Sequence, residues 1–137
     1  SCFSGQGGLH DFLAASRVLV NLLPLTPDTE NILNRDTLSR LQPGGYLINV
    51  ARGAHLVEDD LLALLDSGHL AGATLDVFRT EPLPVGHPFW SHPRITLTPH
   101  TLARTLLGES IAQIVGKIAA LERGEAIAGV VDPVRGY

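Results

Sequence analysis

Four short apolar runs, separated by roughly 20 to 30 residues, restrict the fold of this sequence more than any other feature. The runs begin at Val18, Tyr46, Ala73 and Ile95, and each has the length and the apolar content of a buried strand. Helical patterns occupy two of the three intervals between them. Strands at this spacing pair in parallel through right-handed crossovers. The sequence therefore predicts an α/β protein with a parallel sheet.

The predicted strands cover residues 18–23, 46–50, 73–78 and 95–97. Helices are expected over residues 9–15, over residues 37–41 with Asp36 as the N-cap, after Glu58 as far as Ser67 and Gly68, and over residues 103–123. Residues 5–8 are glycine-rich, but a phosphate-binding loop would need a third glycine where His10 stands. They are expected to form a flexible turn. This order is half of a doubly wound, Rossmann-like nucleotide-binding sheet.

Composition excludes several classes of function. The chain has 137 residues, 45% of them hydrophobic, which fits one compact domain or part of one. Its net charge is -4 and its ten basic residues are scattered, so no nucleic-acid partner is expected. No apolar run approaches the ~18 residues of a membrane span. A single cysteine, Cys2, fits a reducing cytoplasm. The lack of methionine suggests a piece of a longer protein.

Polar residues follow the predicted strands at their carboxyl ends, where open α/β sheets bind ligands. Leu23, Arg52, Asp76 and His100 occupy these positions and are predicted to line one crevice. Arg52 stands among small residues, and its planar guanidinium is suited to gripping a carboxylate through two parallel hydrogen bonds. An arginine at a strand end that simply pairs with a nearby acid is the alternative reading.

Histidines and acids also raise the question of a metal site. Glu81, His87, His92 and His100 lie within 20 residues of sequence, but none of the helical spacings that bring two histidines to one ion occurs there. No metal is therefore expected. The remaining histidines are expected to be surface or satisfied core residues, as are His87 and His92.

Three segments together resemble one known family. Residues 49–53 (Asn-Val-Ala-Arg-Gly), 75–84 (Leu-Asp-Val-Phe-Arg-Thr-Glu-Pro-Leu-Pro) and 97–100 (Leu-Thr-Pro-His) are similar to the three signature blocks of the D-isomer-specific 2-hydroxyacid dehydrogenases. Within the family, residues 88–94 and 131–137 most resemble the glyoxylate/hydroxypyruvate reductase A branch. The resemblance implies an oxidoreductase that uses NADP or NAD to reduce small 2-keto acids such as glyoxylate and hydroxypyruvate.

The resemblance also implies a role for each site residue. Arg52 would hold the substrate carboxylate, and His100 would donate a proton to the carbonyl oxygen as hydride arrives. Glu81 would accept a hydrogen bond from the other imidazole nitrogen and stabilise the imidazolium form. The cofactor would contact Asp76 through its carboxamide and would also lie against a further set: Leu23, Pro24, Val50, Ala51, Arg52 and His100. Thr101 and Leu102 depart from the residues usual after this histidine, so the pocket beside the nicotinamide is expected to have an altered shape.

By the same comparison, residues 1–101 form the C-terminal part of an NAD(P)-binding domain, the second half of its sheet. Residues 102–137 form a long helix and tail that return to a substrate domain absent from this chain. The enzyme is expected to be a homodimer. The glycine-rich phosphate loop is also absent, so the chain alone is expected neither to bind dinucleotide tightly nor to turn over.

Two other readings stay open. Corepressors that resemble these dehydrogenases use the same fold as a dinucleotide-sensing binding module, without catalysis. The chain could also be a folded fragment with no function of its own.

Overall fold

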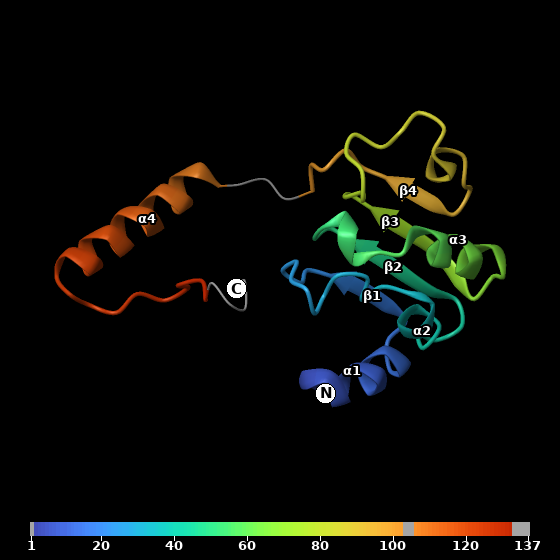
Figure 1. Ribbon diagram of the computed structural model, residues 1–137, viewed down its shortest axis with the longest axis horizontal. Coiled ribbons are helices and arrows are strands. Elements are labelled where there is room, and N and C mark those ends of the chain that lie inside the picture. The colour runs from blue at the N-terminus through green and yellow to red at the C-terminus, as the bar shows by residue number, and fades with distance from the viewer. Residues whose placement is uncertain (1, 103–105, 133–137) are drawn as a thin grey trace. The chain divides into compact units, whose positions relative to one another are not determined.

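The computed structural model describes residues 2–102 and 106–132 of the chain. By its internal contacts the chain divides into two compact units, residues 1–102 and residues 103–137. The first unit contains the whole sheet, and Figure 1 shows helices α2 and α3 packed across one of its faces. In the second unit, the described residues 106–132 contain one helix, α4.

The sheet has four strands in the order β1-β2-β3-β4, and every neighbouring pair is parallel. This confirms the predicted α/β architecture. The strands are bounded as follows: β1 Val18–Asn21, β2 Gly45–Asn49, β3 Leu70–Leu75 and β4 Ile95–Leu97. Only β4 has the predicted bounds. β1 ends two residues early, and β3 begins three residues early, directly after the left-handed residue Gly68 (φ 77°) turns the chain out of the preceding helix.

One face of the sheet carries the core. Helix α1 spans Gly5–Ala14, α2 spans Arg35–Leu38 and α3 spans Glu58–Asp66, and two short 3₁₀ turns, η1 (Gly53–His55) and η2 (Pro88–Trp90), follow β2 and β3. The strand residues of this face are buried against leucines of α2 and α3: Leu19, Leu47, Ala73 and Leu75 against Leu38, Leu61, Leu64 and Leu65.

The other face of the sheet differs from the prediction at β1. The apolar run from Val18 predicted a strand buried on both faces, but Val18 and Val20 are half exposed while Leu19 and Asn21 are buried. The reason is that the described helices cover one face of β1 only, and strand side chains alternate between faces.

The glycine-rich start of the chain is helical, so the predicted flexible turn is wrong. Helix α1 begins at Gly5, although each glycine in a helix costs roughly 1 kcal/mol relative to alanine. Burial outweighs this propensity, because Leu13 is fully buried and Leu9 packs against the same core. Tertiary packing has therefore overridden the local signal.

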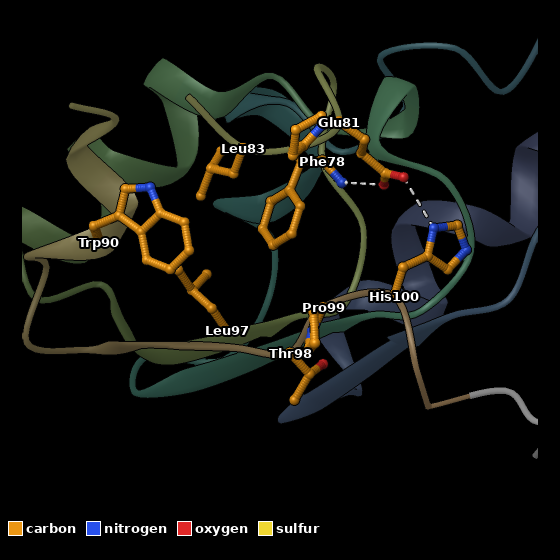
Figure 2. A pocket seen from close by; sticks show the side chains of 9 residues that line it. Phe78, Glu81, Leu83, Trp90, Leu97, Thr98, Pro99 and His100 are labelled. Carbon is orange, nitrogen blue, oxygen red and sulfur yellow. Dashed lines mark hydrogen bonds and ion pairs between the residues drawn. The ribbon is translucent and has the colours of Figure 1, made fainter. Parts of the chain in front are cut away.

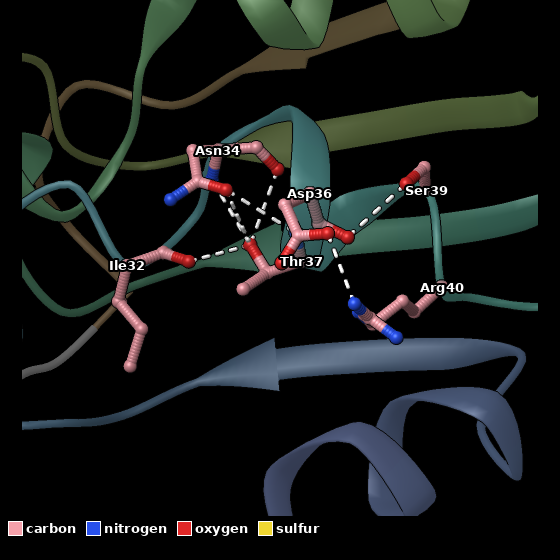
Figure 3. A network of polar contacts seen from close by, with 6 residues as sticks. All are labelled: Ile32, Asn34, Asp36, Thr37, Ser39 and Arg40. Carbon is pink, nitrogen blue, oxygen red and sulfur yellow. Dashed lines mark hydrogen bonds and ion pairs between the residues drawn. The ribbon is translucent and has the colours of Figure 1, made fainter. Parts of the chain in front are cut away.

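The N-terminus of α2 is capped by Asn34 rather than by the predicted Asp36. Figure 3 shows the capping box: the Thr37 main-chain N–H donates to Asn34 Oδ1 (3.2 Å), and the Asn34 N–H donates to Thr37 Oγ1 (3.0 Å). Thr37 Oγ1 also donates to the Ile32 carbonyl (2.5 Å). Asp36 lies two residues further on, in the first turn of α2, where it forms an exposed ion pair with Arg40.

Helix α4 spans Leu107–Glu122, and Gly124 (φ 73°) follows it as predicted. The predicted start at residues 103–105 lies outside the described residues, as does the end of the tail at 133–137. Within the described part of this unit no side chain of α4 is buried. That the helix returns to a substrate domain stays a prediction. Among the described helices, none has both the length and the apolar content needed to cross a membrane.

The capping box predicts a difference between two neighbouring substitutions. Asn34→Ala removes the side-chain oxygen that accepts the Thr37 main-chain N–H and is expected to lower the free energy of unfolding by about 1 kcal/mol. Asp36→Ala removes an exposed ion pair and is expected to cost about 0.5 kcal/mol or less. Urea denaturation of both variants measures the difference. If Asp36→Ala lost as much free energy of unfolding as Asn34→Ala, or more, the assignment of the cap to Asn34 would be wrong.

Candidate active site

The four strands end in register at one edge of the sheet. Asn21, Asn49, Leu75 and Leu97, the last residues of β1 to β4, are aligned as consecutive pairing partners. The loops that follow therefore leave the sheet side by side. Every residue that the sequence predicted for the site lies on one of these loops.

The central contact of the site joins the loop after β3 to the turn after β4. Glu81 Oε2 lies 2.9 Å from His100 Nδ1, and Glu81 Oε1 accepts the Phe78 main-chain N–H at 2.9 Å (Figure 2). An ionised carboxylate only accepts, so Nδ1 carries the proton in this pair. The second ring nitrogen, Nε2, is then the one that can exchange a proton with a ligand.

These contacts lower the pKa of Glu81 below its ordinary value of 4.5. The largest cause is the hydrogen bond from the Phe78 N–H, and the hydrogen bond from His100 comes second. Burial acts in the opposite direction, and the positive charges of His100 and Arg52 add further lowering. Glu81 is therefore ionised at neutral pH.

Arg52 stands directly before η1, in the loop after β2, and its side chain is exposed. Its Nη1 donates to the Ala51 carbonyl (2.6 Å), and its positive charge is the smallest of the influences that lower the pKa of Glu81. None of the ion pairs in the described part of the chain includes Arg52. The alternative reading, an arginine paired with a nearby acid, therefore finds no support there. The structure brings Arg52, Glu81 and His100 to the same edge of the sheet.

Gly53 brings the arginine loop against the glutamate loop. A Cβ added to Gly53 would lie 1.9 Å from the Phe78 carbonyl carbon and 2.4 Å from the Arg79 nitrogen, far inside van der Waals contact. Only glycine allows the two main chains to approach this closely. The contact explains how residues 29 positions apart, Arg52 and Glu81, become neighbours.

Three buried polar residues that sequence reasoning did not assign to the site bind the first two loops together. Asn21 Nδ2 donates to Asn49 Oδ1 (3.0 Å), while Asn49 Nδ2 donates to the Arg52 carbonyl (3.2 Å). His55 is 0% exposed, and its ring nitrogens lie 3.0 Å from the Arg52 carbonyl and 3.3 Å from the Pro24 carbonyl. The available signal was an asparagine at the end of each of two apolar strands.

The predicted cofactor contacts lie along the same loops. The Leu23 main-chain N–H donates to Asn21 Oδ1 (3.2 Å), and Pro24 contributes the carbonyl beside His55. Val50 is half-buried and Ala51 is buried directly after β2. These residues present mainly backbone and small apolar surface, which suits close packing of a planar ring.

Asp76, directly after β3, is 1% exposed and already has three donors. Its Oδ1 accepts from Thr98 Oγ1 (2.5 Å) and from the Thr101 N–H (2.9 Å), and its Oδ2 accepts from the Leu102 N–H (3.1 Å). Burial, the largest single influence, acts to raise the pKa of Asp76, but these hydrogen bonds and the charge of His100 outweigh it and lower the pKa.

Two further histidines, His87 and His92, each pair with an acid of α3. His87 Nε2 lies 3.4 Å from Glu58 Oε2, and His92 Nε2 lies 3.3 Å from Asp66 Oδ1. In residues 2–102 and 106–132, no three side chains of His, Cys, Asp or Glu gather closely enough to hold a metal ion.

A cavity of about 450 Å³ opens beside the Glu81 and His100 pair. Figure 2 shows that mostly apolar side chains form its remaining wall: Phe78, Pro82, Leu83, Trp90, Leu97 and Pro99, with Thr98. The hydrogen-bonded pair of Glu81 and His100 thus stands at the end of an apolar surface.

Comparison with known proteins points to one family. Residues 4–101 match the family model described as "D-isomer specific 2-hydroxyacid dehydrogenase, NAD binding domain". Over 135 residues the chain is 57% identical to glyoxylate/hydroxypyruvate reductase A of Serratia proteamaculans (strain 568). That alignment covers 98% of this chain and 43% of the relative, so the chain spans less than half the length of that curated protein.

Solved structures agree. A D-isomer specific 2-hydroxyacid dehydrogenase from Xanthobacter autotrophicus Py2, in complex with NADPH and MES, has a TM-score of 0.93 and 47% identity, covering 100% of this chain and 57% of that one. An NADPH-dependent glyoxylate/hydroxypyruvate reductase from Sinorhizobium meliloti, in complex with NADP and sulfate, has a TM-score of 0.88 and 41% identity, covering 98% and 44%.

Replacing Gly53 tests the close approach of the two loops. Gly53→Ala must displace either the arginine loop or the Phe78 main chain, and we expect it to lower the free energy of unfolding by about 2 kcal/mol. Gly86→Ala is the control, because a Cβ there meets nothing within 4 Å. Urea denaturation of both variants makes the comparison, and equal stability of the two would refute the contact.

The lowered pKa of Glu81 predicts a pH dependence of stability. Because the folded-state pKa lies below 4.5, the ionised side chain stabilises the fold above about pH 4.5, and this contribution is lost as the pH falls through the folded-state value. The difference in free energy of unfolding between the wild type and Glu81→Gln should therefore shrink from about pH 7 to about pH 3.5. Glu122→Gln, an exposed change on α4, controls for net charge. A difference that grows on acidification would be inconsistent with this sign.

Proposed function

This chain belongs to the D-isomer specific 2-hydroxyacid dehydrogenase family, and from that premise we propose that it is the C-terminal part of an NAD(P)H-dependent reductase of small 2-keto acids. Glyoxylate and hydroxypyruvate are the proposed substrates, by analogy with the reductases of Serratia proteamaculans and Sinorhizobium meliloti. The observation that carries the proposal is the hydrogen-bonded pair of Glu81 and His100 at the edge of the sheet where Arg52 also lies.

Arg52 is the proposed carboxylate-binding residue. Its guanidinium is exposed, and none of the ion pairs in the described ranges occupies it, so its charge is available to a ligand. Two parallel hydrogen bonds to a carboxylate fix the orientation of the adjacent carbonyl as well as its position. Since arginine stays charged at all working pH values, this grip does not change with pH.

His100 is the proposed general acid. Reduction of the carbonyl builds negative charge on its oxygen, and the imidazolium supplies a proton to that oxygen from Nε2. Glu81 accepts the Nδ1 proton at 2.9 Å, which fixes the ring orientation and stabilises the cationic form before the reaction. The Phe78 N–H holds the other carboxylate oxygen, so the pair is anchored to the main chain.

The proposed cofactor is NADP or NAD, which supplies the hydride when it is bound. Two solved relatives contain NADPH or NADP. The described residues fit the nicotinamide end of such a molecule: small and apolar surface at Leu23, Pro24, Val50 and Ala51, with the polar group of Asp76 behind it. Asp76 Oδ2 receives one hydrogen bond in the structure and has capacity for a second, from a carboxamide N–H.

We also propose a cytoplasmic location and a homodimeric assembly for the full-length protein. A cytoplasmic location fits the single cysteine, Cys2, which is exposed and free. A homodimeric assembly of the full-length protein rests on the family resemblance.

Substitution of the two charged residues tests the function in the full-length enzyme. Arg52→Ala and His100→Ala are each expected to lower kcat/KM for glyoxylate by roughly 100-fold or more, because one loses substrate orientation and the other loses the proton donor. Arg40→Ala removes an exposed arginine from a surface ion pair and is the control.

Activity is measured as glyoxylate-dependent oxidation of NADPH and of NADH. Reduction at the wild-type rate by both variants would refute the assignment. Cofactor binding without turnover in the wild type would instead favour the dinucleotide-sensing module.

A further inference from the structure

His100 has an unusual backbone conformation. Its φ is 55°, in the left-handed region, where a residue with a Cβ pays roughly 1 kcal/mol or more relative to ordinary conformations. Among the described residues other than glycine only Asn31, at φ 57°, shares this property. Such a conformation persists only where the surrounding contacts stabilise it. The contacts of residues 98–102, called here the His100 turn, must therefore account for it.

The contact with Glu81 does not account for the left-handed backbone conformation of His100. Glu81 binds the imidazole ring of His100, which constrains the side chain and leaves the backbone dihedral angles of the turn free. Within the turn, the His100 N–H donates to the Thr98 carbonyl at 3.1 Å. Before the turn, the Thr98 N–H donates to the Leu75 carbonyl at 3.0 Å, which continues the pairing of β3 with β4. These bonds define where the turn begins.

Asp76 is the group that contacts the turn on both sides of His100. It binds the Thr98 hydroxyl, two residues before the histidine, and the main-chain N–H groups of Thr101 and Leu102, one and two residues after it. The carboxylate is buried and follows β3 directly, so it is itself fixed by the sheet. Three donors from one turn converge on one rigid acceptor.

We propose that Asp76 and Thr98 are positioning residues, which together fix the backbone of the His100 turn and so the place of the imidazole at the edge of the sheet. The consequence for catalysis depends on the proposed function, in which His100 donates the proton. The geometric claim about the turn stands without it. Asp76 thereby has a role distinct from contact with a cofactor, and Thr98 gains a role in the site.

The same geometry accounts for the unusual residues after the histidine. Thr101 and Leu102 bind Asp76 through main-chain N–H groups, so the side chains at these positions are free to vary without loss of the contacts. The Leu102 side chain is exposed. The departure from the family pattern at these two positions therefore leaves the His100 turn intact.

Thr98 is the residue to replace, because its hydroxyl contacts Asp76 from outside the proposed set of substrate and cofactor contacts. In the full-length enzyme, Thr98→Val keeps the side-chain shape and removes the donor, and it should lower kcat for glyoxylate about tenfold while the dissociation constant of NADPH changes less than twofold. Thr98→Ser restores the hydroxyl and should recover most of the wild-type kcat. Thr96→Val, an exposed change on β4, the strand that precedes the turn, is the control.

Each outcome of these measurements decides the proposal. A kcat for Thr98→Val within twofold of the wild-type value overturns it. Loss of NADPH affinity by as much as kcat also overturns it, because the hydroxyl would then act on cofactor binding. Failure of Thr98→Ser to recover kcat overturns it as well. Circular dichroism and thermal unfolding of each variant test whether it keeps the wild-type fold.

A second measurement is independent of the reaction. Amide hydrogen exchange of at least one of the Thr101 and Leu102 N–H groups in the full-length protein is expected to be about tenfold faster in Asp76→Asn than in the wild type, because the two N–H groups donate to different carboxylate oxygens and asparagine replaces one of these oxygens with an amide nitrogen that cannot accept. Unchanged exchange overturns the proposal even in an active reductase. Faster exchange in a protein that reduces no 2-keto acid supports the turn and refutes only the proposed function.

Discussion

The aligned carboxyl ends of four parallel strands are the constraint on which the rest of this structure depends. Because Asn21, Asn49, Leu75 and Leu97 are pairing partners, the loops after them start at one edge and can exchange contacts. Those contacts are polar, and most of them are at least partly buried. A buried polar group without a partner is costly, so each of these contacts also specifies which loop lies beside which.

The loops that leave this edge of the sheet form the site in two halves. In the first, Asn21, Asn49 and His55 bind the main chain around Pro24 and Arg52. In the second, Asp76 binds the turn around His100, while Glu81 binds its ring. The close approach of Gly53 to Phe78 joins the halves. The exposed side chains of Arg52, Glu81 and His100 therefore stand on loops that hydrogen bonds and close packing hold in place, which restricts the positions of these side chains.

Much of the fold could be predicted from the sequence because it depends on local patterns. The apolar runs and their spacing predicted a parallel sheet, and β4 has the predicted bounds. Two local predictions were wrong. Residues 5–8 are helical because packing overrides propensity, and the N-cap of α2 is Asn34, two residues before the predicted Asp36. Exposure of Val18 and Val20 depends on which face is covered, which an apolar run does not specify.

The sequence by itself determined the residue types of the site and their places after the strands, since Arg52, Glu81 and His100 belong to recognisable local blocks. Only the tertiary structure decided how they meet. Glu81 pairs with His100, and three groups of the His100 turn donate to Asp76, so both sets of contacts join residues that are distant in the chain. The left-handed conformation of His100 depends on the contacts with Asp76. Local propensity carries no information about these contacts, because their energy comes from burial and hydrogen bonding that exist only once the strands are aligned.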